Sequence, residues 1–455
     1  MKKLVASVIL AVISLGVFAS GGKWENLFNG KDLTGWERLN GKAEYTIVKG
    51  EIVGTSKTNT PNTFLATTRT YGDFILEYEM KMDQGLNSGV QIRSESKKEY
   101  NDGRVHGYQV ECDDSPRGWS AGIYDEARRG WLYPMEYNQA AKKSYKQAQW
   151  NKYRVEAIGN SIRTWLNGIP CANLVDDMTP AGFIALQVHA IGKEEANAGK
   201  TICWRNIRIM TENLQANRIK MDASVAEVSY LNNSLTANEK AGGWKLLWDG
   251  KTTEGWRGAG LAAFPKKGWT IEDGMLIPNK GDNKSGGDIV TVKKYKNFIL
   301  EADFKITEGA NSGIKYFIQS EPGKPNTVGF EYQVLDDARH PDAKAGINGN
   351  RTLGSLYDLV TANSQVFDPS QPVKRVNGIG QWNRARIVVN GKKVTHYLNG
   401  VKVVEITRGS QEFKAVIAKS KFNKAPGYGD FEDGYILLQD HGNEVAFKNI
   451  KIKEL

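Results

Sequence analysis

The chain has 455 residues with a formal net charge of +10, 25% charged and 40% hydrophobic residues, and because this length exceeds what one hydrophobic core usually supports, two domains are expected. The lysines are scattered along the chain rather than clustered, which argues against a nucleic-acid partner. The cysteines Cys112, Cys171 and Cys203 are an odd number without metal-ligand spacing, which excludes a disulfide-built scaffold and indicates small buried side chains.

Residues 1–19 have the layout of a secretory signal peptide. Two lysines precede an uninterrupted apolar run that ends in small residues at Val17 and Ala19. No later window approaches the roughly 18 apolar residues that a membrane span needs. We therefore expect an exported protein without a membrane span, most simply periplasmic if the source is a Gram-negative bacterium.

Most of the remaining chain alternates between apolar and polar residues with a period of two. In FILEYEMKM (74–82), for example, Phe74 and Leu76 alternate with Ile75 and Glu77. Such runs, separated by Asn-Gly, Gly-Asn and Ser-Gly turns, are typical of half-buried antiparallel strands. Many short strands within about 200 residues predict a β-sandwich or jelly roll.

The stretch GYQVECDD (107–114) follows the same period. Its apolar residues, such as Val110, would face the core, which places the polar side chains together on the opposite face. Those side chains are Gln109, Glu111 and Asp113. No lysine stands nearby to neutralise the acids, which favours a functional interpretation over an ordinary solvated sheet face.

The segment 211–243 departs from the strand pattern. Its apolar residues from Ile219 to Leu231 are spaced roughly as on an amphipathic helix, and Thr236 with Glu239 forms a capping-box pattern. We interpret the segment as a partly helical linker.

The second half of the chain repeats the first motif by motif. LFNGKDLTGW (27–36), for example, returns as LWDGKTTEGW (247–256), and the further motifs return in the same order. The sequence therefore predicts two copies of one all-β domain with the same topology, residues 24–210 and 244–455.

GYQVECDD has its own echo, GFEYQVLDD (329–337), in which the acid and the amide have exchanged places. Gln109 and Glu111 stand where Glu331 and Gln333 stand in the second copy. In both copies the two side chains lie on one face, about 7 Å apart along the strand. A carboxylate and an amide side by side are therefore the feature that the repeat preserves.

Other polar residues recur at related positions, and we predict that each copy gathers them around one concave pocket. The candidate residues are Arg93, Gln109, Glu111, Asp113, Tyr124 and His189 in the first copy, and Lys315, Glu331, Gln333, Asp336, Tyr357, Gln439 and His441 in the second. Glu111 with His189, and Glu331 with His441, are the predicted base and acid pairs, with the roles inside each pair open. The remaining candidates are predicted to bind substrate.

These motifs resemble those of the 3-keto-disaccharide hydrolase family. The resemblance covers both copies and nearly the whole chain after the signal peptide. It implies a concanavalin A-like jelly roll with a carbohydrate site on the concave sheet. It also implies cleavage of glycosides whose sugar is already oxidised to a ketone at C3, by hydrolysis or by elimination followed by hydration. Some members of the family use a divalent cation, so a metal ion is a further expectation.

The residue types suit that chemistry, because a ketone at C3 acidifies the neighbouring C2–H. One base, one cation or donor at the enolate oxygen and one acid at the leaving group then suffice. Two alternatives stay open. A conventional glycosidase needs two carboxyl groups about 5.5 Å or 6.5–9.5 Å apart, which Glu111 and Asp113 could supply. A non-catalytic carbohydrate-binding pair would use Trp119 and Trp131 as sugar platforms, although core packing is the commoner use of such residues.

Overall fold

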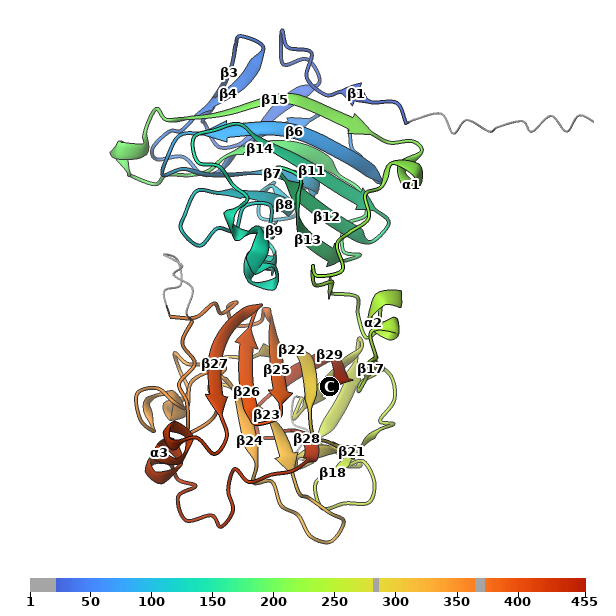
Figure 1. Ribbon diagram of the computed structural model, residues 1–455, viewed down its shortest axis with the longest axis vertical. Coiled ribbons are helices and arrows are strands. Elements are labelled where there is room, and N and C mark those ends of the chain that lie inside the picture. The colour runs from blue at the N-terminus through green and yellow to red at the C-terminus, as the bar shows by residue number, and fades with distance from the viewer. Residues whose placement is uncertain (1–21, 281–285, 365–372) are drawn as a thin grey trace, which may run out of the picture.

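The computed structural model describes residues 22–280, 286–364 and 373–455. The predicted signal peptide, residues 1–19, lies outside the described residues. Each half of the chain forms two sheets, antiparallel apart from the short pair β13 and β16, that pack face to face around a core of its own (Figure 1). Within the described part of the chain, no helix is long and apolar enough to cross a membrane.

The first half builds one sheet of nine strands and one of seven. The larger sheet has the order β16 (Val228–Ser229), β13 (Ile169–Val175), β12 (Ser161–Leu166), β11 (Asn151–Ile158), β6 (Phe74–Met82), β15 (Thr201–Met210), β4 (Glu51–Thr55) and β3 (Glu44–Val48), with β1 (Glu25–Asn26) paired to β15. The smaller sheet has the order β10 (Gly130–Tyr133), β9 (Ile123–Glu126), β8 (His106–Asp113), β7 (Asn87–Glu95), β14 (Phe183–Val188), β5 (Thr63–Thr67) and β2 (Trp36–Asn40).

The second half builds one sheet of eight strands and one of five. The larger sheet has the order β19 (Trp269–Glu272), β20 (Met275–Pro278), β29 (Val445–Glu454), β22 (Phe298–Ile306), β25 (Trp382–Asn390), β26 (Lys393–Leu398) and β27 (Val401–Thr407), with β17 (Trp244–Leu246) paired to β29. The smaller sheet has the order β18 (Trp256–Gly258), β21 (Ile289–Tyr295), β28 (Gly434–Leu438), β23 (Asn311–Ile318) and β24 (Phe330–Leu335).

The smaller sheets of the two halves have the same strand order. β2-β5-β14-β7-β8 in the first half corresponds to β18-β21-β28-β23-β24 in the second, and β7 and β23 carry the repeated NSG motif at their starts. The prediction of an all-β fold made of concanavalin A-like sandwiches is confirmed. The division into domains of residues 24–210 and 244–455 stays a prediction.

The helical elements are short. They are α1 (Leu214–Asn217), α2 (Ala237–Ala241), α3 (Gln411–Lys419) and the 3₁₀ turns Met135–Tyr137, Gln139–Lys143, Glu195–Asn197 and Pro341–Lys344. The predicted capping box at the start of α2 is confirmed, because the Thr236 side chain accepts from the Glu239 N–H and the Glu239 carboxylate accepts from the Thr236 N–H.

The amphipathic helix expected from Ile219 to Leu231 is not what this segment forms. Val225 and Val228 are buried in the core of the first half, and β16 runs parallel to β13 at the edge of the larger sheet. The apolar residues of the linker therefore cover an open sheet edge, which favours an extended backbone over helical spacing.

The two halves touch through the larger sheet of the second half. Arg384 on β25 donates to the Ser229 carbonyl, and its guanidinium carbon lies 3.9 Å from the Tyr230 ring centroid. Val401, at the start of β27, packs in the core cluster of the first half. The Asn377 amide donates to the Arg129 carbonyl at 3.4 Å. These contacts fix the position of the second half beside β16 of the larger sheet and the β9–β10 turn of the smaller sheet.

Candidate active site

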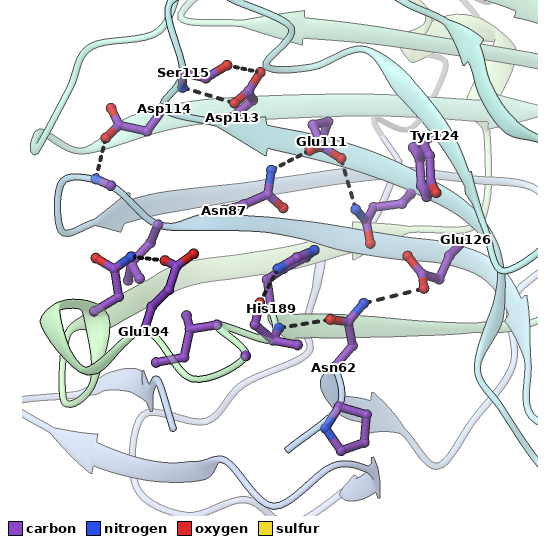
Figure 2. A pocket seen from close by; sticks show the side chains of 18 of the residues that line it. Asn62, Asn87, Glu111, Asp113, Asp114, Ser115, Tyr124, Glu126, His189 and Glu194 are labelled. Carbon is purple, nitrogen blue, oxygen red and sulfur yellow. Dashed lines mark hydrogen bonds between the residues drawn. The ribbon is translucent and has the colours of Figure 1, made fainter. Parts of the chain in front are cut away.

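A groove of about 1620 Å³ covers the face of the smaller sheet that points away from the core of the first half. Five of the predicted site residues line it: Gln109, Glu111, Asp113, Tyr124 and His189. Figure 2 shows Glu111 on β8, Asn87 at the start of β7 and His189 just after β14 directed into this groove. The period of two in β8 explains the arrangement, because Tyr108, Val110 and Cys112 are buried in the core on the opposite face.

The strand register places these side chains in rows across the sheet. Gln109 on β8 stands between Gln91 on β7 and Tyr124 on β9, while Glu111 is paired with Gly89. Because Gly89 has no side chain, it leaves space beside Glu111. The Gln109 side chain occupies that space: a Cβ atom at Gly89 would lie 2.6 Å from its Cδ atom.

A chain of hydrogen bonds leads along this face to Glu111. The Ser94 hydroxyl donates to Oε1 of Gln91 at 2.8 Å, and Nε2 of Gln91 donates to Oε1 of Gln109 at 2.7 Å. Nε2 of Gln109 then donates to Oε2 of Glu111 at 2.9 Å, while Asn87 donates to Oε1 of Glu111 at 2.7 Å. The amides are thus oriented so that both oxygens of Glu111 accept a hydrogen bond.

Glu111 is 3% exposed, and burial raises its pKa to about 7. Arg117 opposes this rise, with one guanidinium nitrogen 4.0 Å from Oε1, and the amides of Asn87 and Gln109 also lower the pKa. The charge of Asp113 adds to the rise. A carboxyl group with a pKa near neutrality can both give and take a proton at physiological pH, as a general acid or base must.

The hydrogen bond of the His189 ring to the backbone determines which ring nitrogen carries the proton. Its Nδ1 lies 2.8 Å from the Ala190 carbonyl oxygen, which can only accept, so Nδ1 is the protonated nitrogen. Burial lowers the pKa of the imidazole, which keeps the ring neutral at pH 7. In this tautomer Nε2 holds a lone pair and can accept a proton.

Asp113 serves a different purpose from Glu111. Its carboxylate accepts from the Ser115 N–H and hydroxyl and from Nε of Arg117, the last at 2.5 Å. These bonds hold the Arg117 guanidinium at the wall of the groove, where it also lies 4.7 Å from the Trp119 ring centroid. Asp113 therefore positions a cation next to Glu111.

The two tryptophans weighed as sugar platforms differ in exposure. Trp119 is fully buried and packs edge-on against Trp131, with 4.7 Å between the ring centroids. Trp131 is 6% exposed and lines the groove next to Tyr124. Core packing thus accounts for Trp119, while Trp131 forms part of the groove wall.

Arg93 does not lie beside Glu111 as the sequence predicts. It is 1% exposed, donates to the carbonyls of Gly72 and Gly159, and forms an ion pair with Asp73 at 2.9 Å. These bonds join loops at the end of the sandwich, away from the groove.

The physical reason is an irregularity in β7. The pairing register of β7 with β8 shifts between Ile92 and Glu95, and Arg93 has a positive φ of 45°. The extra residue reverses the alternation of side chains, so Arg93 leaves the face that Gln91 occupies. In the second half Phe317, with φ of 62°, takes the same place in β23.

The second half carries a related but distinct set of residues. Lys315 is paired with Glu331 across β23 and β24, where the first half has Gln91 and Gln109. Nζ of Lys315 lies 3.6 Å from Oε2 of Glu331. Burial raises the pKa of Glu331, and the charges of Lys315, Lys421 and His441 lower it. These residues are therefore close neighbours, as predicted for Lys315 and His441.

The remaining candidates of the second half differ in placement. Tyr357 is bonded through its backbone N–H to the Glu331 carbonyl, and Gln439 is bonded in the same way to Gly313, so both lie next to the acid–amide pair. Asp336 instead accepts from the backbone N–H groups of Gly309 and Ala338. Its carboxylate holds a loop rather than facing the pair.

Gln333 stands directly beside Glu331 on the same strand face. With its amide nitrogen turned toward the acid, Gln333 donates to Oε1 of Glu331 at 3.0 Å. The Glu331 side chain lies over Gly313, where a Cβ atom would come within 2.3 Å of Oε1. The amide-to-carboxylate hydrogen bond and the glycine beneath it are thus present in both halves.

Several residues of the groove were not predicted from the sequence. Glu126 is buried in the groove wall and accepts from Asn62 and Arg104, and Arg375 reaches the groove from the second half. Gln91 could have been found by aligning NSGVQ with NSGIK, which matches it to Lys315. Glu126 ends β9 and Arg375 lies in a loop of the second half, and no repeated motif marks either residue as functional.

A metal ion is a further expectation from the sequence. Within the described ranges, no group of three or more His, Cys, Asp or Glu side chains lies close enough together to hold one. Glu111 and Glu126 are instead engaged with amides and arginines, and Asp113 with Ser115 and Arg117. Cys112, Cys171 and Cys203 are free and buried, as predicted.

Comparison with known proteins gives a consistent result. The family model described as 3-keto-alpha-glucoside-1,2-lyase-like domain matches residues 23–210 and 243–453. A 3-keto-disaccharide hydrolase of Bacteroides thetaiotaomicron is 35% identical over 269 residues, which cover 54% of this chain and 89% of that protein.

Solved structures of two putative glycosyl hydrolases from Parabacteroides distasonis also match. One is 35% identical with a TM-score of 0.42 and covers 49% of this chain and 99% of its own. The other is 26% identical with a TM-score of 0.34 and covers 47% of this chain and 99% of its own.

Proposed function

The chain belongs to the 3-keto-alpha-glucoside-1,2-lyase-like family, and we propose that it cleaves the glycosidic bond of sugars oxidised to a ketone at C3. The observation that carries the proposal is the pairing, in one groove, of a buried carboxyl group whose pKa is about 7 with a neutral imidazole. Such a pair suits proton removal next to a ketone and protonation of a leaving group.

The proposed reaction is an elimination followed by hydration. Nε2 of His189 removes the proton from C2, and the electron pair of that C–H bond forms the enolate of the C3 ketone. The enolate then expels the oxygen at C1, so that a C1=C2 double bond forms while Glu111 protonates the leaving oxygen. Water adds across the double bond, with its oxygen at C1 and its proton at C2. The net change is hydrolysis.

The roles within the pair follow from protonation states. His189 is neutral with its lone pair on Nε2, so it can accept a proton but has none to give there. Because burial raises the pKa of Glu111 to about 7, Glu111 still carries a proton to give near neutral pH. We therefore assign His189 as the base and Glu111 as the acid.

Two donors are suited to the developing enolate oxygen. Arg117 is held in the groove wall by Asp113, and burial together with Glu126 and Glu111 raises the pKa of Tyr124 to about 12, which keeps its hydroxyl protonated. A preorganised donor at such an oxygen contributes roughly 3–4 kcal/mol to transition-state stabilisation.

A conventional two-carboxylate mechanism has less support. Asp113, the second carboxyl group that it requires, is committed to Arg117 and Ser115, and Leu335 stands in the corresponding position of the second half. We propose the elimination route for both halves, with Glu331 and His441 as the corresponding pair of the second. Export, which rests on residues 1–19, is part of the proposal.

The test compares a 3-keto disaccharide with the same disaccharide unoxidised. To assign activity to one half, we define the first-site variant as the protein that carries Glu331→Gln and His441→Ala. The proposal predicts that this variant still cleaves the 3-keto disaccharide and leaves the unoxidised one intact. Binding of either sugar without cleavage, by the wild-type protein and the variant alike, would instead indicate a carbohydrate-binding module.

A further inference from the structure

One residue that lines the groove of the first half, Arg375, comes from the second half. Arg375 is 8% exposed and lines the groove together with Glu111 and Tyr124. Its guanidinium carbon lies 5.4 Å from the ring centroid of Trp119 and 5.9 Å from that of Trp131. Its positive charge also lowers the pKa of Tyr124, which places it close to the predicted catalytic residues.

The second half fixes the position of Arg375. The Arg375 carbonyl accepts a hydrogen bond from the Asn399 amide in the turn between β26 and β27. On one side, Lys374 forms an ion pair with Asp337 at 2.6 Å. On the other, Asn377 is bonded to Asn383 of the second half. The backbone is thus anchored in one sandwich while the side chain reaches into the groove of the other.

The contact between the halves continues around this side chain. Gly400, in the turn that holds Arg375, lies against Tyr137 and Pro134 of the first half so closely that a Cβ atom there would be 2.8 Å from the Tyr137 ring. The Asn377 amide reaches the Arg129 carbonyl on the other side. Arg375 therefore enters the groove through a packed interface.

The strand order places Arg375 relative to the predicted catalytic residues. Gln109 pairs with Tyr124 on β9, and Tyr124 pairs with Trp131 on β10. Arg375 beside Trp131 therefore lies toward the β10 edge of the sheet, whereas His189 follows β14, on the far side of β7 and β8. Arg375 and His189 thus lie on opposite sides of the strand that carries Glu111.

We propose that Arg375 is a specificity-determining residue of the first site, where it binds the hydroxyl groups of the sugar next to the 3-keto ring. A guanidinium presents donors in a fixed fork that can reach two adjacent hydroxyls. The second copy of the repeat thus completes the site of the first copy. This inference rests on the proposed function, because it names the part of the same substrate that Arg375 holds.

The test uses two substrates that differ only in the neighbouring sugar, a 3-keto disaccharide and the methyl 3-keto-glucoside. Both are assayed with the first-site variant, with and without Arg375→Met. We expect this substitution to raise KM for the disaccharide at least about tenfold, the loss expected for one hydrogen bond to a charged group. For the methyl glycoside, kcat/KM stays within about twofold. Arg375→Lys, which keeps the charge without the fork, gives an intermediate KM for the disaccharide.

Arg69→Met is the matched control, because Arg69 is exposed, pairs with Glu25 and does not line the groove. We expect Arg69→Met to leave KM and kcat/KM unchanged for both substrates. Equal losses on both substrates with Arg375→Met, or no loss on either, would overturn the inference while leaving the proposed function intact. If the unsubstituted protein cleaves neither substrate, the proposed function fails and the inference falls with it. Thermal melting checks that the Arg375→Met variant is folded. If that variant is unfolded, KM of the Arg375→Lys variant for the two substrates tests the inference instead.

Discussion

Nε2 of Gln109 donates a hydrogen bond to Oε2 of Glu111 at 2.9 Å, and the second half has the same bond in reverse order when the Gln333 amide nitrogen is turned toward Glu331, to which it then donates at 3.0 Å. The inversion of acid and amide therefore preserves the bond while moving the carboxylate two residues along the strand. In the first half the acid lies near Arg117, and in the second it lies beside Lys315. The two sites thus offer one set of functional groups in two arrangements.

The first prediction concerns the pH dependence of cleavage. Burial raises the pKa of Glu111 to about 7, and as the acid Glu111 must be protonated in the free protein. For the first-site variant we expect kcat/KM to fall as the pH rises through about 7. A rise over the same range would assign Glu111 as the base and reverse the roles.

The second prediction separates the two steps of the reaction. In the first-site variant, Glu111→Gln removes the acid but leaves the base, so exchange of the C2 proton with solvent persists while cleavage falls at least about 100-fold. His189→Ala removes the base and abolishes both. Proton NMR of the 3-keto disaccharide in deuterated water measures both processes. Loss of exchange in the Glu111→Gln variant would show that Glu111 takes the proton.

The third prediction concerns stability. Because the folded pKa of Glu111 is raised from 4.5 to about 7, the folded protein binds more protons than the unfolded chain between these values. The contribution of Glu111 to stability is thus fully present below pH 4.5 and is lost as the pH rises through about 7. The free energy of unfolding of the Glu111→Gln variant, relative to that of the wild type, should therefore be more favourable at pH 8 than at pH 5, by up to about 3 kcal/mol. Urea unfolding of both proteins at both pH values measures the difference. An equal change in unfolding free energy at pH 5 and pH 8 would contradict the raised pKa.

The fourth prediction concerns Gly89, which lies under the side chains of Gln109 and Glu111. A Cβ atom at Gly89 would lie 2.6 Å from Cδ of Gln109, so Gly89→Ala displaces Gln109 and breaks its bond to Glu111. In the first-site variant we expect a loss of cleavage together with a stability cost of about 1–3 kcal/mol. Gly72→Ala is the control, since its nearest neighbours are 3.8 Å away. Equal activity of the two alanine variants would show that the position of Gln109 does not matter.

Much of the fold and half of the site could be predicted because both depend on local patterns. The period of two placed Gln109, Glu111 and Asp113 on one face, and the repeat predicted that both halves share a topology. His189 and Tyr124 were found because each has a counterpart at the same place in the second half.

The errors have identifiable causes. Arg93 leaves the predicted face because of an extra residue in β7, and irregular pairing of this kind is not visible in an alternating pattern. Val225 and Val228 have helical spacing but cover a sheet edge instead. Arg375 was missed because it reaches the groove through packing between the halves, about which local sequence carries no information.

The most direct test of the proposed chemistry is deuterium incorporation at C2. The wild-type protein is incubated with a 3-keto disaccharide in deuterated water, and C2 of the released sugar is examined by NMR. Elimination followed by hydration predicts deuterium at C2 of the released 3-keto sugar, none at carbon in the other sugar, and no cleavage of the unoxidised disaccharide. Release of the 3-keto sugar without deuterium at C2, or equal cleavage of the unoxidised disaccharide, would contradict it.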